Sequence, residues 1–176
     1  MRSIRTIGLG ILPTKSLLSL AVAIGAGLLF GAFMAISDAY LFRAAVPASL
    51  QKLISHSTVV ERIAYFTKAV LIDELVFRLV LMTVIVWLLV KFFGAPRGWF
   101  YWLAILVAAL VANPVFHTAY LATLNVTALT VLRELVLHGE AGVLWGYLYW
   151  RHGLIAAIAG HVSAHISLEP LSTALG

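Results

Sequence analysis

Ionisable residues in otherwise apolar segments are the chemistry-bearing feature of this sequence. The first group is Asp73, Glu74 and Arg78, near the middle of the apolar stretch 62–93. Glu74 and Arg78 are one helical turn apart and share a helix face, whereas Asp73 points about 100° away around the helix. Because a charge at membrane depth is costly, these residues mark either a functional site or a structural ion pair.

Histidines supply the second and third groups. His117 follows Asn113-Pro114, a pair that favours a helix start, and we expect the helix N-terminus to keep this imidazole neutral. His161 and His165 are four residues apart and share one face of the last apolar segment. A carboxylate and a neutral imidazole can activate a water molecule, and further imidazoles can donate hydrogen bonds to a developing oxyanion.

The same side chains also form an ordinary metal-ligand set. Three imidazoles and a carboxylate can bind zinc or iron, so His117, His161, His165 and Glu74 make up a metal or haem alternative. Hydrolysis by an activated water needs no cofactor, and we expect none, with a divalent metal as the open alternative. The sequence contains no His-Glu-x-x-His run and no phosphate-binding glycine loop.

The composition is that of a membrane protein. Of the 176 residues, 62% are hydrophobic and 11% are charged, and the mean hydropathy is +1.03; soluble domains have about 45–50% apolar and about 25% charged residues. A disordered or collagen-like chain is excluded, and the lack of cysteine excludes disulfides and thiolate chemistry. We attribute the net charge of +5 to membrane topology and lipid headgroups, and expect the lipid bilayer but no nucleic acid as a partner.

The apolar segments predict an all-α polytopic membrane bundle of roughly six helices, some of them short or re-entrant. The stretch 38–61 is the most polar and predicts an interfacial loop with an amphipathic turn. Breaks are expected at 94–98, at Asn113-Pro114, at 138–140 and at 151–153. The predicted helices are 17–36, 62–93, 99–112, 113–137, 141–150 and 154–167.

A single membrane domain is expected over residues 1–176. It divides into an N-terminal helix with an interfacial segment (1–60) and a catalytic core (61–168). The basic residues Arg2, Arg5 and Lys15 precede the first apolar stretch and predict a cytoplasmic N-terminus. That stretch is longer than a signal-peptide core, so we expect a retained helix rather than a cleaved signal peptide.

The order of the motifs resembles the CAAX-protease and bacteriocin-processing (CPBP, Abi-like, glutamic-type) intramembrane protease family. The family pattern is a Glu-Glu-x-x-x-Arg helix, a later Phe-x-x-x-His, and a final His-x-x-x-Asn/Asp helix behind a glycine-rich stretch. The similarity covers residues 70–166. The matching residues are Asp73-Glu74-x-x-x-Arg78, Asn113-x-x-x-His117, Gly142-x-x-x-Gly146-Tyr147-Leu148-Tyr149-x-Arg151-x-Gly153, and His161-x-x-x-His165.

The resemblance implies an intramembrane peptidase that hydrolyses a peptide bond without a covalent intermediate. Its substrate would be a membrane-embedded or lipidated peptide or protein, and its location a prokaryotic inner (plasma) membrane. The implied roles are water activation by Asp73 (with Glu74) and His117, orientation of the carboxylates by Arg78, and polarisation of the scissile carbonyl by His161 with His165.

The chain departs from the family pattern at several positions. Asp73 stands where the family has Glu, which shortens the reach of the acid by one methylene. Asn113 replaces Phe, His165 replaces Asn or Asp, and Leu79 replaces the glycine that commonly follows the arginine. Two alternatives stay open: a catalytically inactive scaffold or immunity protein of the same fold, and a histidine-rich metal- or haem-binding membrane protein.

Overall fold

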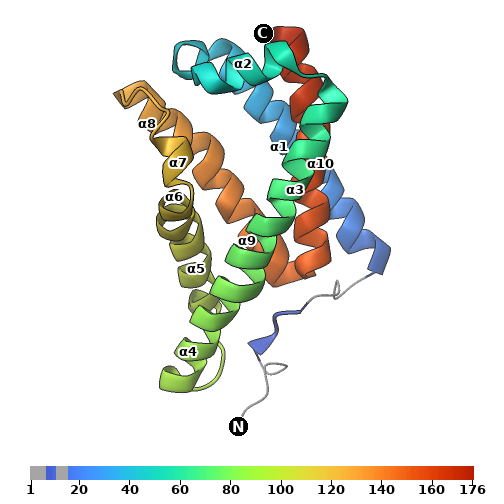
Figure 1. Cartoon of the computed structure of the whole chain (residues 1–176). Helices are drawn as coiled ribbons and strands as arrows, with labels where there is room; N and C mark the ends of the chain where they lie inside the picture. The colour runs from blue at the N-terminus through green and yellow to red at the C-terminus, as the bar shows by residue number, and fades with distance from the viewer. Residues whose placement is uncertain (1–6, 11–15) are drawn as a thin grey trace.

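The chain folds into a bundle of helices (Figure 1). The computed structural model describes residues 7–10 and 16–176, and every regular element within them is helical. The predicted all-α fold is confirmed, and the chain is a membrane protein. The basic residues used to predict its orientation, Arg2, Arg5 and Lys15, lie outside the described residues. In the part of the chain that the structure describes, four helices are long and apolar enough to cross a membrane: Leu17–Tyr40, Val59–Phe93, Gly98–Phe116 and Leu154–Leu175.

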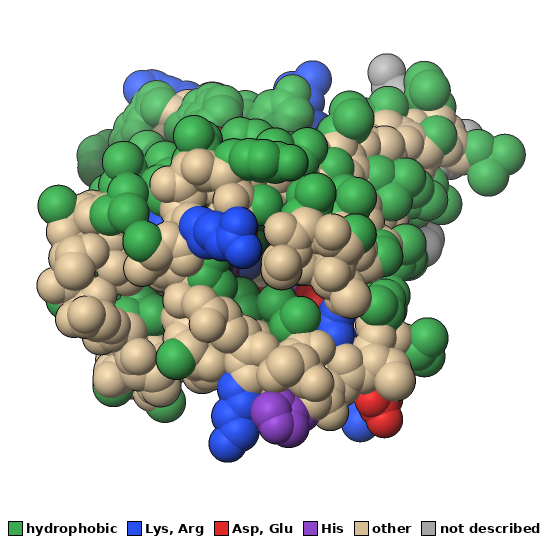
Figure 2. Space-filling model, turned by 90° about the horizontal axis from the view of Figure 1, so that it is seen from above, with side chains coloured by type: hydrophobic (Ala, Val, Ile, Leu, Met, Phe, Trp, Pro, Cys, Tyr) green, Lys and Arg blue, Asp and Glu red, His purple; other side chains and the backbone are tan. Residues whose placement is uncertain are grey.

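Apolar side chains cover much of the outside of the bundle. Seen from above, hydrophobic side chains dominate the upper part of the surface and only a few charged side chains are visible (Figure 2). Leu29, Val80 and Phe92 are among the large apolar residues that are exposed. In a bilayer such side chains contact lipid tails that are equally apolar, so their exposure carries no penalty.

The first helix and the polar stretch after it follow the prediction closely. Helix α1 (Ser16–Tyr40) extends the predicted 17–36 by about one turn. The polar stretch contains a short 3-10 turn, η2 (Arg43–Ala45), and helix α2 (Ala48–His56), which has no buried residue. This arrangement suits a segment at the edge of the membrane.

One long helix carries the acidic pair. A capping box between Thr58 and Glu61 begins it, and Gly94, with φ 92°, ends it at the predicted break. Its middle is π-helical and starts at the acidic pair; such widened turns are frequent at functional sites. The consecutive elements are α3 (Val59–Asp73), η3 (Glu74–Met82) and α4 (Thr83–Phe93).

The predicted break at Asn113-Pro114 is wrong. Asn113 has helical backbone angles, and its N–H bonds to the carbonyl of Ala108, five residues back. This π-type register precedes Pro114, so the missing proline N–H does not interrupt the helix. The helix ends at His117 instead, where φ is −98° and ψ is 30°. Its elements are α5 (Gly98–Val107), η4 (Ala108–Ala112) and α6 (Asn113–Phe116).

The predicted break at 138–140 is also wrong, and the helix expected to start at residue 113 starts at Ala128. The hydroxyl of Thr127 caps this start by accepting the N–H of Thr130. Gly139 keeps helical angles and does not end the helix; a β-carbon there would lie 3.3 Å from Leu110. After the short helix α7 (Thr118–Leu121), one run contains α8 (Ala128–Glu134), η5 (Leu135–Gly139) and α9 (Glu140–His152).

The last helix, α10 (Leu154–Leu175), starts where predicted but continues about two turns past residue 167. Gly153, with φ 88°, makes the break before it. Pro170 lies inside the added part and does not end it. Glu169 in these turns pairs with Arg62 of α3 at 2.8 Å, so a tertiary contact holds the added turns in place.

Helices α1 and α10 lie side by side in unusually close contact (Figure 1). Gly27 of α1 faces the backbone of Gly160, and Gly31 faces that of Ala164. A β-carbon on either α1 glycine would overlap the facing carbonyl group. This is the small-residue packing by which membrane helices associate, and it fixes the position of the helix that carries His161.

Candidate functional site

Glu74 lies at the centre of the site. Its side chain is 0% exposed, and Oε1 is 2.9 Å from Nδ1 of His161 on α10. Its other oxygen, Oε2, is 3.5 Å from Nε of Arg78, which confirms the ion pair predicted from their spacing. The helix α3–η3 therefore meets α10 at a buried carboxylate, Glu74, which contacts both the guanidinium of Arg78 and the imidazole of His161.

The bond to Glu74 fixes the chemical state of His161. An ionised carboxylate only accepts hydrogen bonds, so Nδ1 carries the proton and donates it to Glu74. The other ring nitrogen, Nε2, then has a free lone pair and forms no hydrogen bond with any described residue. Trp145 stacks on the ring with a centroid distance of 5.0 Å and holds its plane. A histidine held in this way is suited to accept a proton at Nε2.

Buried polar atoms that form no hydrogen bond lie around this contact. Arg78 donates from Nη2 to the carbonyl oxygen of Gly142 at 3.1 Å, which ties η3 to α9. Among the described residues, the buried side-chain atoms without a hydrogen-bond partner are Glu74 Oε2, Arg78 Nε and Trp145 Nε1. Glu74 Oε2 and Arg78 Nε nevertheless face each other in the ion pair at 3.5 Å, so Trp145 Nε1 is the atom of the three that lacks a polar contact among the described residues.

Asp73 and His117 form a second pair beside the first. Nε2 of His117 is 3.4 Å from Oδ1 of Asp73, and the side chains are 34% and 17% exposed. As expected from the helix geometry, Asp73 points away from Glu74's partners. His117 lies after the C-terminal end of α6 rather than in the first turn of a long helix, and its Nδ1 faces the Asn113 carbonyl at 3.0 Å. Both ring nitrogens face acceptors, and the Asp73 carboxylate raises the pKa of His117.

This raised pKa predicts a titration that depends on Asp73. We expect the imidazole of His117 to titrate above its ordinary value of 6.5 and Asp73→Asn to bring its pKa back toward that value. The stability that the charged pair contributes is full below 6.5 and is lost as the pH rises through the raised pKa. NMR titration of histidine-labelled protein in micelles measures both. An unchanged His117 titration in Asp73→Asn contradicts the pairing.

His165 lies next to His161 on α10. Its Nδ1 is 3.2 Å from Oε1 of Glu169, one turn further along α10. Its ring stacks between Phe66, at a centroid distance of 4.6 Å, and His161, at 5.7 Å. A ring held on both faces and at one nitrogen cannot easily reorient, so His165 helps to position His161.

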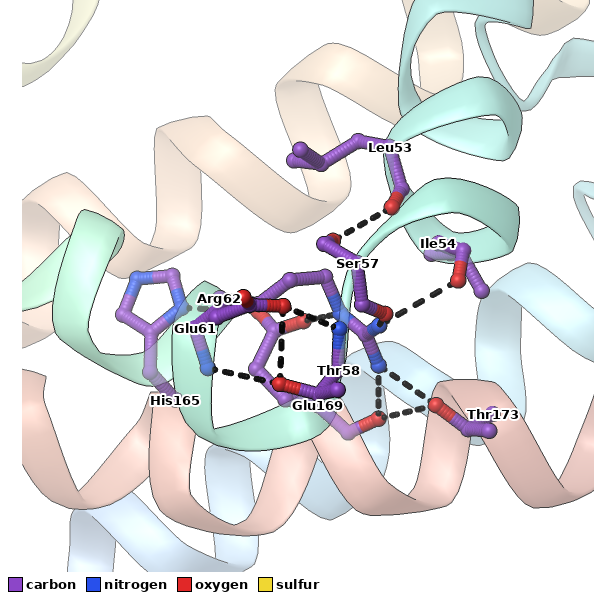
Figure 3. A network of polar contacts seen from close by, with 9 residues as sticks. All are labelled: Leu53, Ile54, Ser57, Thr58, Glu61, Arg62, His165, Glu169 and Thr173. Carbon is purple, nitrogen blue, oxygen red and sulfur yellow. Dashed lines mark hydrogen bonds and ion pairs between the residues drawn. The ribbon is translucent and has the colours of Figure 1, made fainter.

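A buried network next to His165 was not predicted from the sequence (Figure 3). Arg62 donates through Nε to Glu169 at 2.8 Å, and its Nη1 donates to the carbonyl oxygen of Ser57 at 2.7 Å. Its Nη2 donates to the Glu169 carbonyl and to the hydroxyl of Thr173. The available signal was an arginine and a glutamate, each flanking an apolar segment, but 107 residues separate them.

A second missed cluster joins the end of α1 to α8. Buried Arg133 forms two 2.7 Å hydrogen bonds to the carboxylate of Asp38 and a third to Glu134. The hydroxyl of Tyr120 donates to Glu134, and burial raises the pKa of Tyr120 to about 12. Every group in this cluster has a partner, so we assign it to the stability of the fold.

The predicted site residues therefore assemble in two adjoining carboxylate–imidazole pairs rather than in one group. Asp73 and Glu74 are consecutive on one helix and hold histidines from different helices. Within the described ranges, no three His, Asp or Glu side chains are grouped so that they could hold a metal ion. Of the four residues of the metal alternative, Glu74 contacts His161 and His161 stacks on His165, whereas His117 pairs with Asp73.

Comparison with known proteins identifies no relative. No protein-family model, no curated protein and no solved structure matches the chain. The function must therefore be inferred from the two pairs and from the motif resemblance alone.

Proposed function

We propose that this chain is an intramembrane peptidase, which hydrolyses a peptide bond in a membrane-embedded or lipidated peptide or protein. The buried contact between Glu74 and His161, which leaves Nε2 of His161 free, carries this proposal. A water molecule that donates to this nitrogen is placed for activation by the pair. The motif order shared with the CPBP family supports the same reaction class.

His161 is the general base in this proposal. Its Nε2 takes a proton from the attacking water, and Glu74 stabilises the imidazolium that forms through the Nδ1 hydrogen bond. Arg78 orients Glu74. The water oxygen bonds to the carbonyl carbon, the proton held by His161 passes to the amide nitrogen, and the C–N bond breaks to give a carboxylic acid, which keeps the second water proton, and an amine.

His117 stabilises the oxyanion: its Nε2–H turns from Oδ1 of Asp73, a contact of 3.4 Å, to the oxygen of the scissile carbonyl. A protonated imidazole is a stronger donor than a neutral one, and the Asp73 carboxylate favours the protonated form. This assignment exchanges the roles that the family resemblance implies, in which the first acid and the middle histidine activate the water. The exchange follows from the acceptors facing both nitrogens of His117 and from the free nitrogen of His161.

The surroundings of the site agree with a membrane-embedded substrate. Glu74 lies inside the candidate span Val59–Phe93, and His161 lies inside Leu154–Leu175. A peptide bond reaching them must enter from within the bilayer or from its surface. We further propose a prokaryotic inner membrane as the location, with a cytoplasmic N-terminus.

Comparison of membrane peptides tests the proposed activity. Cells that produce the wild-type chain should accumulate cleavage products that are absent from cells producing His161→Ala at an equal level in the membrane. Mass spectrometry of membrane-associated peptides identifies the products and the cleaved bond. Identical peptide pools in the two strains would favour the inactive scaffold instead.

A further inference from the structure

Glu140 is an acidic residue that neither the proposed reaction nor the packing of the chain uses. Its side chain is exposed, and it forms no hydrogen bond or ion pair with a residue that the structure describes. The residues one turn before and after it are Val136 and Leu144, so its own helix supplies no cation. The other acidic residues in the described part of the chain all have a polar partner.

Glu140 lies level with a candidate membrane span, Gly98–Phe116, although its own helix is not among the candidate spans. It stands midway along the continuous helix that runs from Ala128 to His152, about 18 Å from either end at 1.5 Å per residue. The preceding residue, Gly139, lies against Leu110, which belongs to the candidate span Gly98–Phe116. A carboxylate at this depth is costly unless a partner neutralises it, so its presence points to a binding function.

Glu140 also lines a groove whose other walls are apolar. The groove has a volume of about 530 Å³. Four of its lining residues, Leu135, Gly139, Val143 and Tyr147, recur every four positions, so the groove follows one face of the η5–α9 helix over about 18 Å. Phe30 of α1 and Trp102 of α5 form part of the sides. Its length and direction suit a second helix lying along α9.

We propose that this groove binds a transmembrane helix of another protein that carries a lysine or arginine near the middle of its span. The apolar walls match the helix surface, and the unpaired carboxylate of Glu140 matches the basic side chain, which has the same need for a partner within the bilayer. The groove does not include the reacting groups. Its wall residue Phe30 packs against Trp145, and Trp145 lies between Phe30 and His161, on which it stacks. The binding site is therefore an exosite and does not depend on the proposed hydrolysis.

Model peptides test this proposal without any assay of activity. The full chain is reconstituted in phosphatidylcholine nanodiscs with dansyl-labelled leucine-alanine peptides of about 20 residues that carry Lys, Leu or Glu at the centre. Energy transfer from the tryptophans, of which Trp102 lines the groove, reports binding. We expect the Lys peptide to bind about ten-fold more tightly than the Leu peptide.

Variants assign this preference to the groove. Glu140→Gln should remove the preference for Lys, and Glu140→Lys should transfer it to the Glu peptide. Val143→Trp, which fills the groove, should weaken all three peptides, and Lys68→Gln, an exposed charge on α3, should change none. Equal binding of the three peptides, or a preference retained in Glu140→Gln, overturns the proposal. Self-association of the chain that Glu140→Gln abolishes also overturns it, because the groove would then bind a second copy.

Discussion

Glu74→Gln should lower the rate of peptide-bond hydrolysis by about 10²–10⁴-fold, the range that general acid–base catalysis contributes. The amide can still accept the Nδ1–H of His161, so the ring keeps its orientation. What is lost is the negative charge that stabilises the imidazolium after proton transfer. The rate is measured with purified variants in nanodiscs. The substrate is the membrane protein or peptide from which the cleavage products identified by mass spectrometry arise.

A second variant separates catalysis from folding. Glu74→Gln also leaves the buried guanidinium of Arg78 without its carboxylate, which costs stability. His161→Gln keeps the Glu74–Arg78 pair and removes only the imidazole, so it should lose a similar share of activity while its thermal stability stays close to wild type. Hydrolysis by His161→Gln at the wild-type rate would contradict the mechanism.

The pH profile distinguishes the two possible role assignments. If His117 donates as an imidazolium, activity falls as the pH rises through its raised pKa, and Asp73→Asn moves that fall to lower pH because the carboxylate no longer raises the pKa. If His117 is the base, as the family resemblance implies, its titration limits activity on the acidic side instead.

Glu169→Ala should lower the free energy of unfolding by about 3–5 kcal/mol, because it leaves the buried charge of Arg62 uncompensated. Both side chains are almost fully buried, at 1% and 4% exposure, so water cannot replace the lost partner. Denaturant unfolding in detergent micelles measures the change. The double variant Arg62→Leu/Glu169→Leu should lose less than Glu169→Ala, since it removes both charges.

The control for this experiment is Glu61→Ala, which removes an exposed carboxylate one residue before Arg62. Glu61 accepts the backbone N–H of Thr58 at an exposed position, so we expect a much smaller loss than in Glu169→Ala. Equal losses in Glu169→Ala and Glu61→Ala would contradict the buried ion pair. Glu169→Ala also removes the hydrogen-bond partner of His165 Nδ1, whereas Glu61→Ala leaves it in place.

Local spacing predicted part of the site well. The ion pair between Glu74 and Arg78 follows from one helical turn and needs no tertiary information. The divergence of Asp73 from Glu74 follows from the same geometry. Because polar residues are scarce in the apolar segments, His161 could be identified as a candidate site residue. The carboxylate that it contacts could not be predicted.

A local change of helix type and contacts between distant helices explain what could not be predicted. Asn113-Pro114 is a strong helix-start signal, but a π-type turn before it absorbs the missing N–H, and His117 therefore follows the end of a helix instead of lying in its first turn. The pairing of Arg62 with Glu169 depends on two helices far apart in the sequence. No local pattern carries that information, and the end of α10 was predicted too early for the same reason.

The glycine contact between α1 and α10 bears on what counts as the working unit of this protein. The residues that resemble the protease family span 70–166 and exclude α1 entirely. Yet the backbone beside Gly160, one residue before His161, rests on the carbonyl of Ala23 and on Gly27. A helix that contributes none of the candidate site residues thus helps to fix the position of His161, the base in our proposal, so residues 70–166 depend on α1 for their arrangement.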